Sequence, residues 1–302
     1  MADERDDYDV FLETWEPGEG LLHASLPQNL SDPFIRQRLL NDSSGNGPVS
    51  RTDFAPGYKT MEEEERIIRA YSFFEGQHEH WAEHFRDLAL SNGVPEKKLE
   101  TFTSSFAQLW VDGKRRRQDS PEMLAIKASV SLFDGSAFPQ HAGRFVLEVI
   151  DPSVQPLFTP GEMRAIFDTN AGLIEAFLPE YIDHLGHEGP GSLSDLYVRR
   201  GVYMPSLDMS LRRELHFLSS YSLALGPVEL FAQTWTPATR YTGTPTILSA
   251  PLSAVQNRIV AFAPFIANMD LRQLEFVVAP PVEKTPLIDD GSHGGIREFR
   301  FL

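Results

Sequence analysis

A carboxylate and an amide stand two residues apart in an apolar segment near the end of the chain. The segment RQLEFVVAPP, residues 272–281, is rich in aromatic and β-branched residues and is stopped by two prolines, which is typical of a β-strand. Because side chains of a strand alternate between its two faces, we expect Gln273 and Glu275 to point to the same side. This pattern makes the two residues candidates for a functional site.

A second segment, LYVRRGVYM, places an arginine among apolar residues. Arg200 directly precedes Gly201 and shares a predicted strand face with Val198 and Val202. Arginine is rarely buried without a partner. It is either a strand-end residue whose stem packs while its head reaches water, or a bidentate clamp for a phosphate or carboxylate.

A third segment, LHFLSSYSLALG, carries Ser220 and Ser222 on one face of a predicted strand. Such hydroxyls either bond to nearby backbone groups, or position a ligand and brace a catalytic side chain. The pattern Ser-x-Ser also begins at Ser129, and Gln-x-Glu also begins at Gln77. Each pattern alone is therefore unspecific, and only the order and the setting of the three segments indicate a function.

A different chemistry is indicated by the string HWAEH, which begins at His80. His80 and His84 lie four residues apart and would share one face of a helix. The string resembles the inverted zinc-protease motif, in which two histidines bind zinc and a glutamate, here Glu83, is the general base. The flanking small residues and a third ligand are not found. The simpler interpretation is a polar helix edge beside an apolar stripe that includes His78.

Composition limits the other classes of function. The chain has 302 residues, 41% of them hydrophobic, and a net charge of −16. It contains no cysteine, which excludes disulfides, thiolate metal sites and cysteine nucleophiles. Nucleic-acid binding usually requires a basic surface, so the charge argues against that partner. The basic run GKRRRQ, residues 113–118, is interpreted as a solvated face or a linker.

No window of the sequence approaches the roughly 20 apolar residues of a membrane helix, so we expect no membrane partner. The first residues, MADERDDYDV, are acidic and polar, unlike a Sec-type signal peptide or a transit peptide. We therefore expect a cytoplasmic protein, or one exported without a Sec signal into a host or target cell.

Periodicity predicts an α+β protein with two parts. Residues 1–138 are expected to form a mainly helical region after a flexible acidic start, and residues 139–302 a mixed α/β lobe. The expected helices cover approximately 61–90, 96–111, 121–132 and 225–235, with one or two more within 159–185. The expected strands cover 196–204, 216–222, 246–249, 259–265, 274–279 and 296–302, and the segment RFVLEVI is either a short strand or another buried segment.

The three segments, in this order, resemble the mono-ADP-ribosyltransferase toxin family, whose signature is Arg, Ser-Thr-Ser and Glu/Gln-x-Glu. The matching residues are Arg200, Ser220-Tyr221-Ser222 and Gln273-Leu274-Glu275. The resemblance covers roughly the last 110 residues and implies a lobe with two packed β-sheets. Tyr221 replaces the usual small middle residue. The short gap between Arg200 and Ser220 leaves Arg199 as an alternative clamp.

The resemblance also implies roles for these residues, with NAD as co-substrate. Glu275 would be the catalytic carboxylate, which stabilises an oxocarbenium-like centre on the ribose. Arg200, beside Gly201, would bind the dinucleotide phosphate. Ser220 or Ser222 would orient Glu275 and line the nicotinamide pocket, and Gly201 and Tyr221 would also contact the cofactor. No metal is implied.

Gln273 would address the acceptor, and in this family a glutamine at that position goes with acceptors other than arginine. The turn PFIANMDLR before it would face the substrate, with Phe265 as a contact. The resemblance thus implies a toxin or effector that transfers ADP-ribose, with a protein as the acceptor. The alternatives are a non-enzymatic adaptor that binds through its helical half and, third, a zinc-dependent hydrolase that uses His80, Glu83 and His84.

Overall fold

The computed structural model describes residues 60–110, 120–134, 153–185, 196–204, 218–223, 228, 232, 244–271, 274–279, 287–293 and 296–300. Its long helices are α4 (Thr60–Ser91), α5 (Glu96–Ser105), α7 (Pro121–Asp134) and α8 (Pro160–Leu185). A π-helical turn, η1 (Phe106–Trp110), continues α5. The predicted helices in these regions are confirmed, and residues 160–185 form one helix. Of the helix expected at 225–235, only Val228 and Ala232 are described, and both are helical and buried.

The described strands form one seven-stranded sheet with the order β4-β5-β2-β1-β3-β7-β6. Their bounds are β1 (Tyr197–Met204), β2 (Ser219–Ser222), β3 (Thr244–Pro251), β4 (Ile259–Phe262), β5 (Glu275–Val278), β6 (Ile288–His293) and β7 (Ile296–Arg300). β3 and β7 are parallel, and the other neighbours are antiparallel. The α+β class is confirmed, whereas two packed sheets are not confirmed by these strands. The segment RFVLEVI lies outside the described residues.

Strand β6 was missed by the sequence pattern, because its sequence IDDGSH has neither apolar alternation nor β-branched runs beyond its first residue. Its position at the end of the sheet, paired with β7, explains how such a polar sequence becomes a strand. An edge strand needs hydrogen-bonding partners on one side and tolerates charged side chains.

The ends of α4 and α8 follow from local sequence. Gly93, with φ of 91°, ends α4, and the Val94 amide donates to the Ala89 carbonyl oxygen at 3.0 Å, as in a Schellman motif. At the start of α8, the Thr159 amide donates to Glu162 Oε2 at 2.7 Å, and the Glu162 amide donates to Thr159 Oγ1 at 3.3 Å. This reciprocal pair is a capping box.

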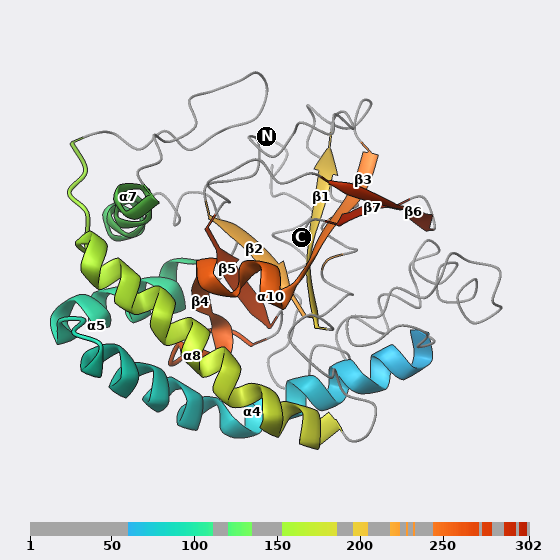
Figure 1. Cartoon of the computed structure of the whole chain (residues 1–302), viewed down its shortest axis with the longest axis horizontal. Coiled ribbons are helices and arrows are strands. Elements are labelled where there is room, and N and C mark those ends of the chain that lie inside the picture. Colours follow the sequence, from blue (N-terminus) through green and yellow to red (C-terminus); the bar gives the residue numbers. More distant parts are fainter. Residues whose placement is uncertain are drawn as a thin grey trace, which may run out of the picture.

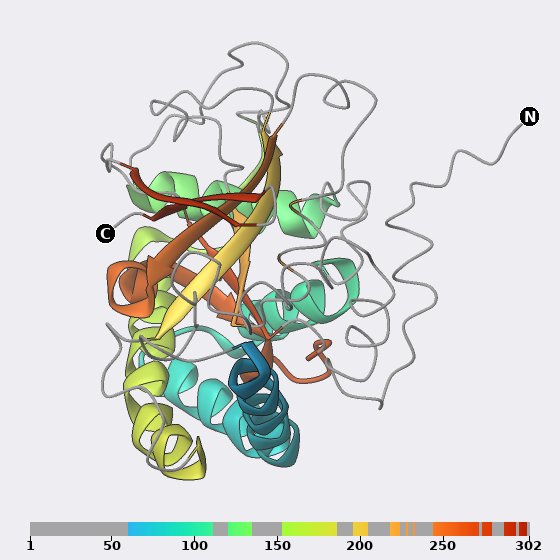
Figure 2. The same cartoon turned by 90° about the vertical axis from the view of Figure 1, so that its right-hand side faces the viewer.

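Helices α4 and α8 lie beside each other on one side of the sheet, near the strands β4 and β5 (Figure 1). α8 packs against β4, and α4 packs against the short helix η5 (Ala263–Phe265) that follows β4. The view turned by 90° shows both helices below and beside the sheet (Figure 2). No helix among the described residues is both long and apolar enough to cross a membrane.

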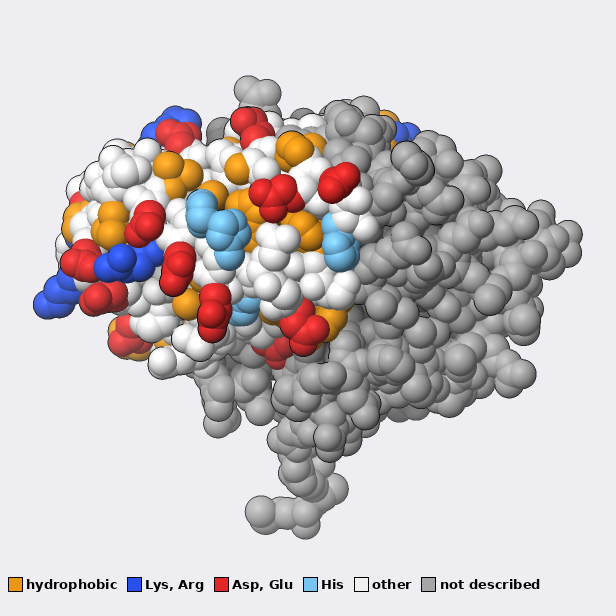
Figure 3. All heavy atoms as spheres, turned by 90° about the horizontal axis from the view of Figure 1, so that it is seen from below, with side chains coloured by type: hydrophobic (Ala, Val, Ile, Leu, Met, Phe, Trp, Pro, Cys, Tyr) orange, Lys and Arg blue, Asp and Glu red, His pale blue; other side chains and the backbone are white. Residues whose placement is uncertain are grey.

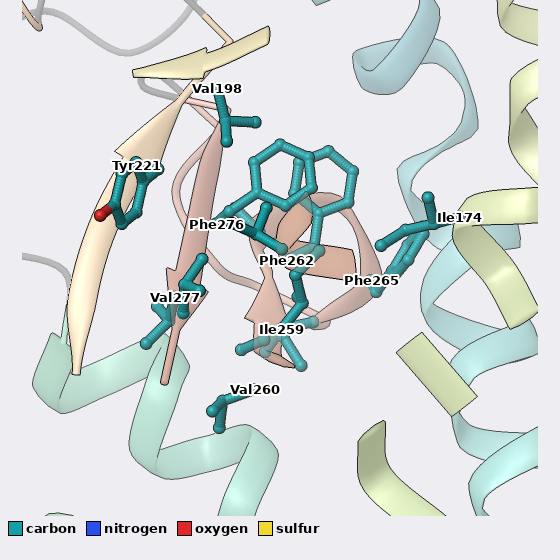
Figure 4. Close-up of a cluster of buried hydrophobic side chains, with 14 of the residues drawn as sticks. Ile174, Val198, Tyr221, Ile259, Val260, Phe262, Phe265, Phe276 and Val277 are labelled. Atoms are coloured by element: carbon teal, nitrogen blue, oxygen red, sulfur yellow. The ribbon is translucent and has the colours of Figure 1, made fainter. Parts of the chain in front are cut away.

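An aromatic cluster joins these helices to the sheet. Phe262 of β4 stacks on Phe276 of β5, with ring centroids 3.8 Å apart, and its edge contacts Phe74 of α4 at 5.2 Å. Phe177 of α8 also stacks on Phe262. Figure 4 shows Phe262, Phe265 and Phe276 between the strands and α8. Residues on both sides of the expected boundary at 138 belong to one buried core.

Candidate active site

Three neighbouring strands bring the three sequence motifs together. β2 lies between β1 and β5, so the segments with Arg200, Ser220 and Glu275 are adjacent in space. In the register of the sheet, Ser222 is paired with Arg199 on one side and with Glu275 on the other. The sheet therefore collects polar side chains that are far apart in the sequence.

Glu275 is the first residue of β5, and its carboxylate accepts hydrogen bonds from two directions. The indole nitrogen Nε1 of Trp110 donates to Glu275 Oε1 at 2.7 Å. The hydroxyl of Ser220, on the neighbouring strand, also bonds to the Glu275 side chain. A carboxylate with donors from two different elements has a fixed orientation, which a catalytic group requires.

The pKa of Glu275 lies above its usual value. Burial of the carboxyl group is the main cause, because it disfavours the charged form. The hydrogen bonds from Ser220 and Trp110 and the positive charge of Arg200 lower the pKa but do not cancel this effect, and the negative charge of Asp270 raises it further. A carboxyl group with opposing influences of this kind is a frequent feature of active sites.

The charge of Arg200 acts on the same carboxylate. Its Nη1 donates to the backbone carbonyl oxygen of Ser220 at 3.2 Å. Its Nε is buried and has no hydrogen-bond partner among the described residues. Burial lowers the pKa of Arg200, whereas the nearby Tyr221 and Glu275 raise it. A buried guanidinium with an unused donor suits an anionic ligand, because the ligand would supply the missing partner.

The neighbouring Arg199 is used differently. Its Nε donates to Glu298 Oε1 of β7 at 3.2 Å, and the two side chains are only 4% and 3% exposed. This buried ion pair joins β1 to β7 on the far side of β3. Of the two candidate clamps, Arg199 is engaged with Glu298, and Arg200 is the one whose charge lowers the pKa of Glu275.

The other residues of the two motifs surround this centre. Ser222 is buried directly opposite Glu275, and Gly201 is paired with Ile247 of β3. Tyr221 is 4% exposed, and its hydroxyl points away from the phenylalanine cluster (Figure 4). Burial raises the pKa of Tyr221.

The segment before β5 departs from the expected strand. Leu274 has φ of 44°, and its amide donates to the Leu271 carbonyl oxygen at 3.0 Å, so a turn ends there and the strand begins at Glu275. The expected alternation through Leu274 is therefore wrong, because a left-handed residue breaks the period of two. Gln273 lies outside the described residues.

The expected contact of Phe265 with the substrate is also wrong. Phe265 is fully buried and packs against Trp81, Phe177 and Phe262. In the turn that follows, the exposed residues are Ala267 and Asn268. The apolar character of Phe265 thus serves the core, while the turn presents small and polar groups.

Among the described residues, no hydrogen bond joins a histidine of α4 to Glu275, Ser220 or Arg200. His80, Glu83 and His84 are exposed, and Nδ1 of His84 bonds to the His80 carbonyl oxygen at 2.9 Å. Figure 3 shows a face on which histidine and acidic side chains are exposed. No group of three His, Cys, Asp or Glu that could hold a metal ion is found in the described part of the chain. His78 is half-buried, and its Nε2 bonds to the Ile266 carbonyl oxygen at 3.0 Å.

Two residues near Glu275 were not predicted from the sequence. Trp110 has the position of an ordinary apolar residue at the end of a helix, and Asp270 has that of an ordinary loop acid. The hydrogen bond from Trp110 to Glu275 spans 165 residues of sequence. Neither residue carries a local signal that links it to the three motifs.

Comparisons with protein-family models, with curated proteins and with solved structures find no match to this chain. The resemblance to the mono-ADP-ribosyltransferase toxins therefore rests on the three short motifs themselves.

Proposed function

We propose that the protein cleaves NAD and transfers its ADP-ribosyl group to an acceptor other than arginine, on a protein, as a toxin or effector. One observation carries this proposal. The carboxylate of Glu275 on β5 is hydrogen-bonded by Ser220 of β2 and is influenced by the charge of Arg200 on β1. These are the residues on which the sequence resemblance depends. The resemblance depends on the order of these residues in the sequence and not on their proximity in the fold. Their proximity is therefore independent support for the proposed function.

The reaction places a defined demand on the site. The bond between the ribose C1′ and the nicotinamide nitrogen breaks, and its electron pair leaves with neutral nicotinamide. The ribosyl group becomes oxocarbenium-like. A nucleophile of the acceptor then bonds to C1′ and loses a proton. An ionised Glu275 would stabilise the positive charge on the sugar in the transition state.

Arg200 supplies the complementary function in this proposal. Its buried Nε lacks a partner among the described residues, and a phosphate of the dinucleotide offers oxygen acceptors for it. Ser220 connects the two charged groups, because its carbonyl oxygen accepts from Arg200 and its hydroxyl bonds to Glu275. Gln273 lies two residues before Glu275 in the sequence. We propose an acceptor other than arginine because the residue at this position is a glutamine.

The proposal is tested by release of nicotinamide from NAD by purified protein, with and without a mixed lysate. We expect Glu275→Gln to lower the rate by about a hundredfold or more, the size of effect typical for loss of transition-state electrostatic stabilisation. Glu83→Gln is the matched control, because Glu83 is an exposed glutamate of α4. It should leave the rate unchanged, and both variants should retain the circular dichroism of the wild type.

The labelling pattern tests the second half of the proposal. Incubation with labelled NAD and lysate should label a protein, and mass spectrometry of the labelled peptide should place the ADP-ribosyl group on a side chain other than arginine. Equal release of nicotinamide by wild type and Glu275→Gln would disprove the role of Glu275. A wild type without NAD cleavage in several lysates would instead support an adaptor function.

A further inference from the structure

We infer that Trp110 is a positioning residue that fixes the carboxylate of Glu275, so that the helical first half of the chain completes the site. The inference deepens the proposed function, and it rests on that function for its catalytic part. Its structural basis is the 2.7 Å hydrogen bond from Trp110 Nε1 to Glu275 Oε1. Trp110 comes from the expected helical region, whereas all the motif residues lie after residue 196.

The indole is held in place by its own surroundings. Trp110 is 4% exposed, and its ring contacts Phe106, one turn earlier in η1, with centroids 5.6 Å apart. π-Helical turns such as η1 are rare and are frequent at functional sites. Trp110 is the last residue of this turn.

The helix that carries η1 is itself anchored. Lys98 of α5 donates to Glu162 Oε2 of α8 at 2.7 Å, and Phe102 packs edge-on against Phe158, with centroids 5.7 Å apart. Because α8 packs against β4, the position of α5 is tied to the sheet. The indole N–H is therefore presented to Glu275 from a rigid support rather than from a free loop.

The hydrogen bond has a specific consequence for a catalytic carboxylate. An indole N–H can only donate, so it favours the ionised form of Glu275 and selects one orientation of its oxygen. Ser220 contacts the same carboxylate from β2. Loss of Trp110 would leave a half-buried carboxylate with weaker support, harder to ionise and less well oriented. Both effects lower the fraction of enzyme that is ready to react.

The experiment compares two tryptophan variants. Trp110→Phe keeps an aromatic ring and removes the N–H. Trp81→Phe is the matched control, because Trp81 is 2% exposed and its Nε1 donates to Gln77 Oε1 at 3.0 Å in the same helical half. NAD cleavage is measured from pH 5 to pH 9, with kcat and KM determined separately, and thermal unfolding is recorded for each variant.

We expect Trp110→Phe to lower kcat by about tenfold, the size typical for a lost hydrogen bond to a charged group, with little change in KM. The acid limb of its pH profile for NAD cleavage should move to higher pH. Trp81→Phe should keep the pH profile of the wild type even if its unfolding temperature falls. Because Trp110→Phe could fail to fold, benzothienylalanine at position 110 serves as a second variant. It keeps the shape of the indole and replaces the N–H with sulfur.

A measurement without NAD separates this inference from the proposed function. The side-chain carboxyl of Glu275 is titrated by NMR in protein carrying carbon-13 glutamate, and its signal is assigned by its loss in Glu275→Gln. Removal of the Trp110 N–H should raise the pKa of Glu275, whether or not the protein cleaves NAD. An unchanged titration would overturn the inference. So would an unchanged acid limb in an active enzyme, or faster NAD cleavage, which would mean that the indole blocks the carboxylate.

Discussion

Glu275 shows how a single side chain can be both costly for the fold and suited to chemistry. Burial opposes its ionisation, while Trp110, Ser220 and Arg200 favour it. The folded protein therefore holds a carboxylate that loses its proton less readily than it would in the unfolded chain. Residues of this kind are retained for function more often than for stability.

The direction of this pKa shift predicts a pH-dependent stability. A raised folded-state pKa gives a contribution that is fully present below the unfolded-state pKa and is lost as pH rises through the folded-state pKa. The glutamine of Glu275→Gln does not ionise, so this variant does not lose that contribution to stability as pH rises. Its side-chain oxygen can still accept a hydrogen bond from Trp110. We therefore expect its unfolding temperature, relative to the wild type, to increase from pH 4 to pH 7.

Thermal unfolding of both proteins by circular dichroism, at half-unit steps of pH, checks this prediction. Glu83→Gln is again the control, because Glu83 is an exposed glutamate of α4. Its unfolding temperature should differ from that of the wild type by an amount that does not change with pH. A difference for Glu275→Gln that is constant with pH, or that falls toward pH 7, would show that ionisation of Glu275 does not oppose folding.

The strands assign different tasks to two adjacent arginines. Arg199 is paired with Glu298, so β1 and β7 are joined through charges that are almost completely buried. Arg200 donates to the Ser220 carbonyl oxygen of β2, and the charge of Glu275 raises its pKa. The consecutive sequence Arg-Arg did not distinguish these tasks, because the partner of each arginine lies on another strand.

This assignment predicts opposite consequences of substitution at the two positions. Arg199→Met should reduce the free energy of unfolding by about 3–5 kcal/mol, because it leaves Glu298 buried without its cation. The double variant Arg199→Met, Glu298→Leu should recover most of this loss. Its KM for NAD should equal that of the wild type.

Arg200→Met is the comparison variant. It should remain close to the wild type in stability and should raise the KM for NAD, because the clamp of the proposed site is lost. Urea unfolding and nicotinamide release, measured on all three variants, check the prediction. A stable Arg199→Met protein with a raised KM would identify Arg199 as the clamp.

At the scale of the whole molecule, the helices and the sheet share one core. Phe74 of α4 contacts Phe262 of β4, and His78 of α4 bonds to the Ile266 carbonyl oxygen in the turn before β5. α4 thus supports the segment that leads to Glu275, and η1 contributes Trp110. The helical half is structurally part of the proposed site.

A truncated chain tests this view. Residues 139–302 alone would expose the apolar faces of α8 and η5 that α4 covers, and would lack Trp110. Because an apolar face needs a covering layer to be stable, we expect this fragment to unfold without a cooperative transition and to release no nicotinamide. Differential scanning calorimetry of the fragment and the full chain measures this. A fragment with a sharp transition and full activity would mean that the first half is dispensable.

The sequence by itself determined the elements whose signals are local. The apolar stripe of α4 predicted its helix, since helical periodicity depends on near neighbours. The aromatic and β-branched run of β5 predicted a strand in the same way. The motif residues Arg200, Ser220 and Glu275 were also found in the sequence. That they form one site was expected only from the resemblance.

Only the tertiary structure decided which polar groups meet. The choice of Arg200 beside Glu275, the burial of Phe265 and the bond from Trp110 depend on strand order and on packing between distant segments. The turn at Leu274 likewise depends on its surroundings, because leucine has no intrinsic preference for positive φ. Hydrophobic periodicity tells which side of an element is buried, but the partner on that side is selected by the packing of the whole chain.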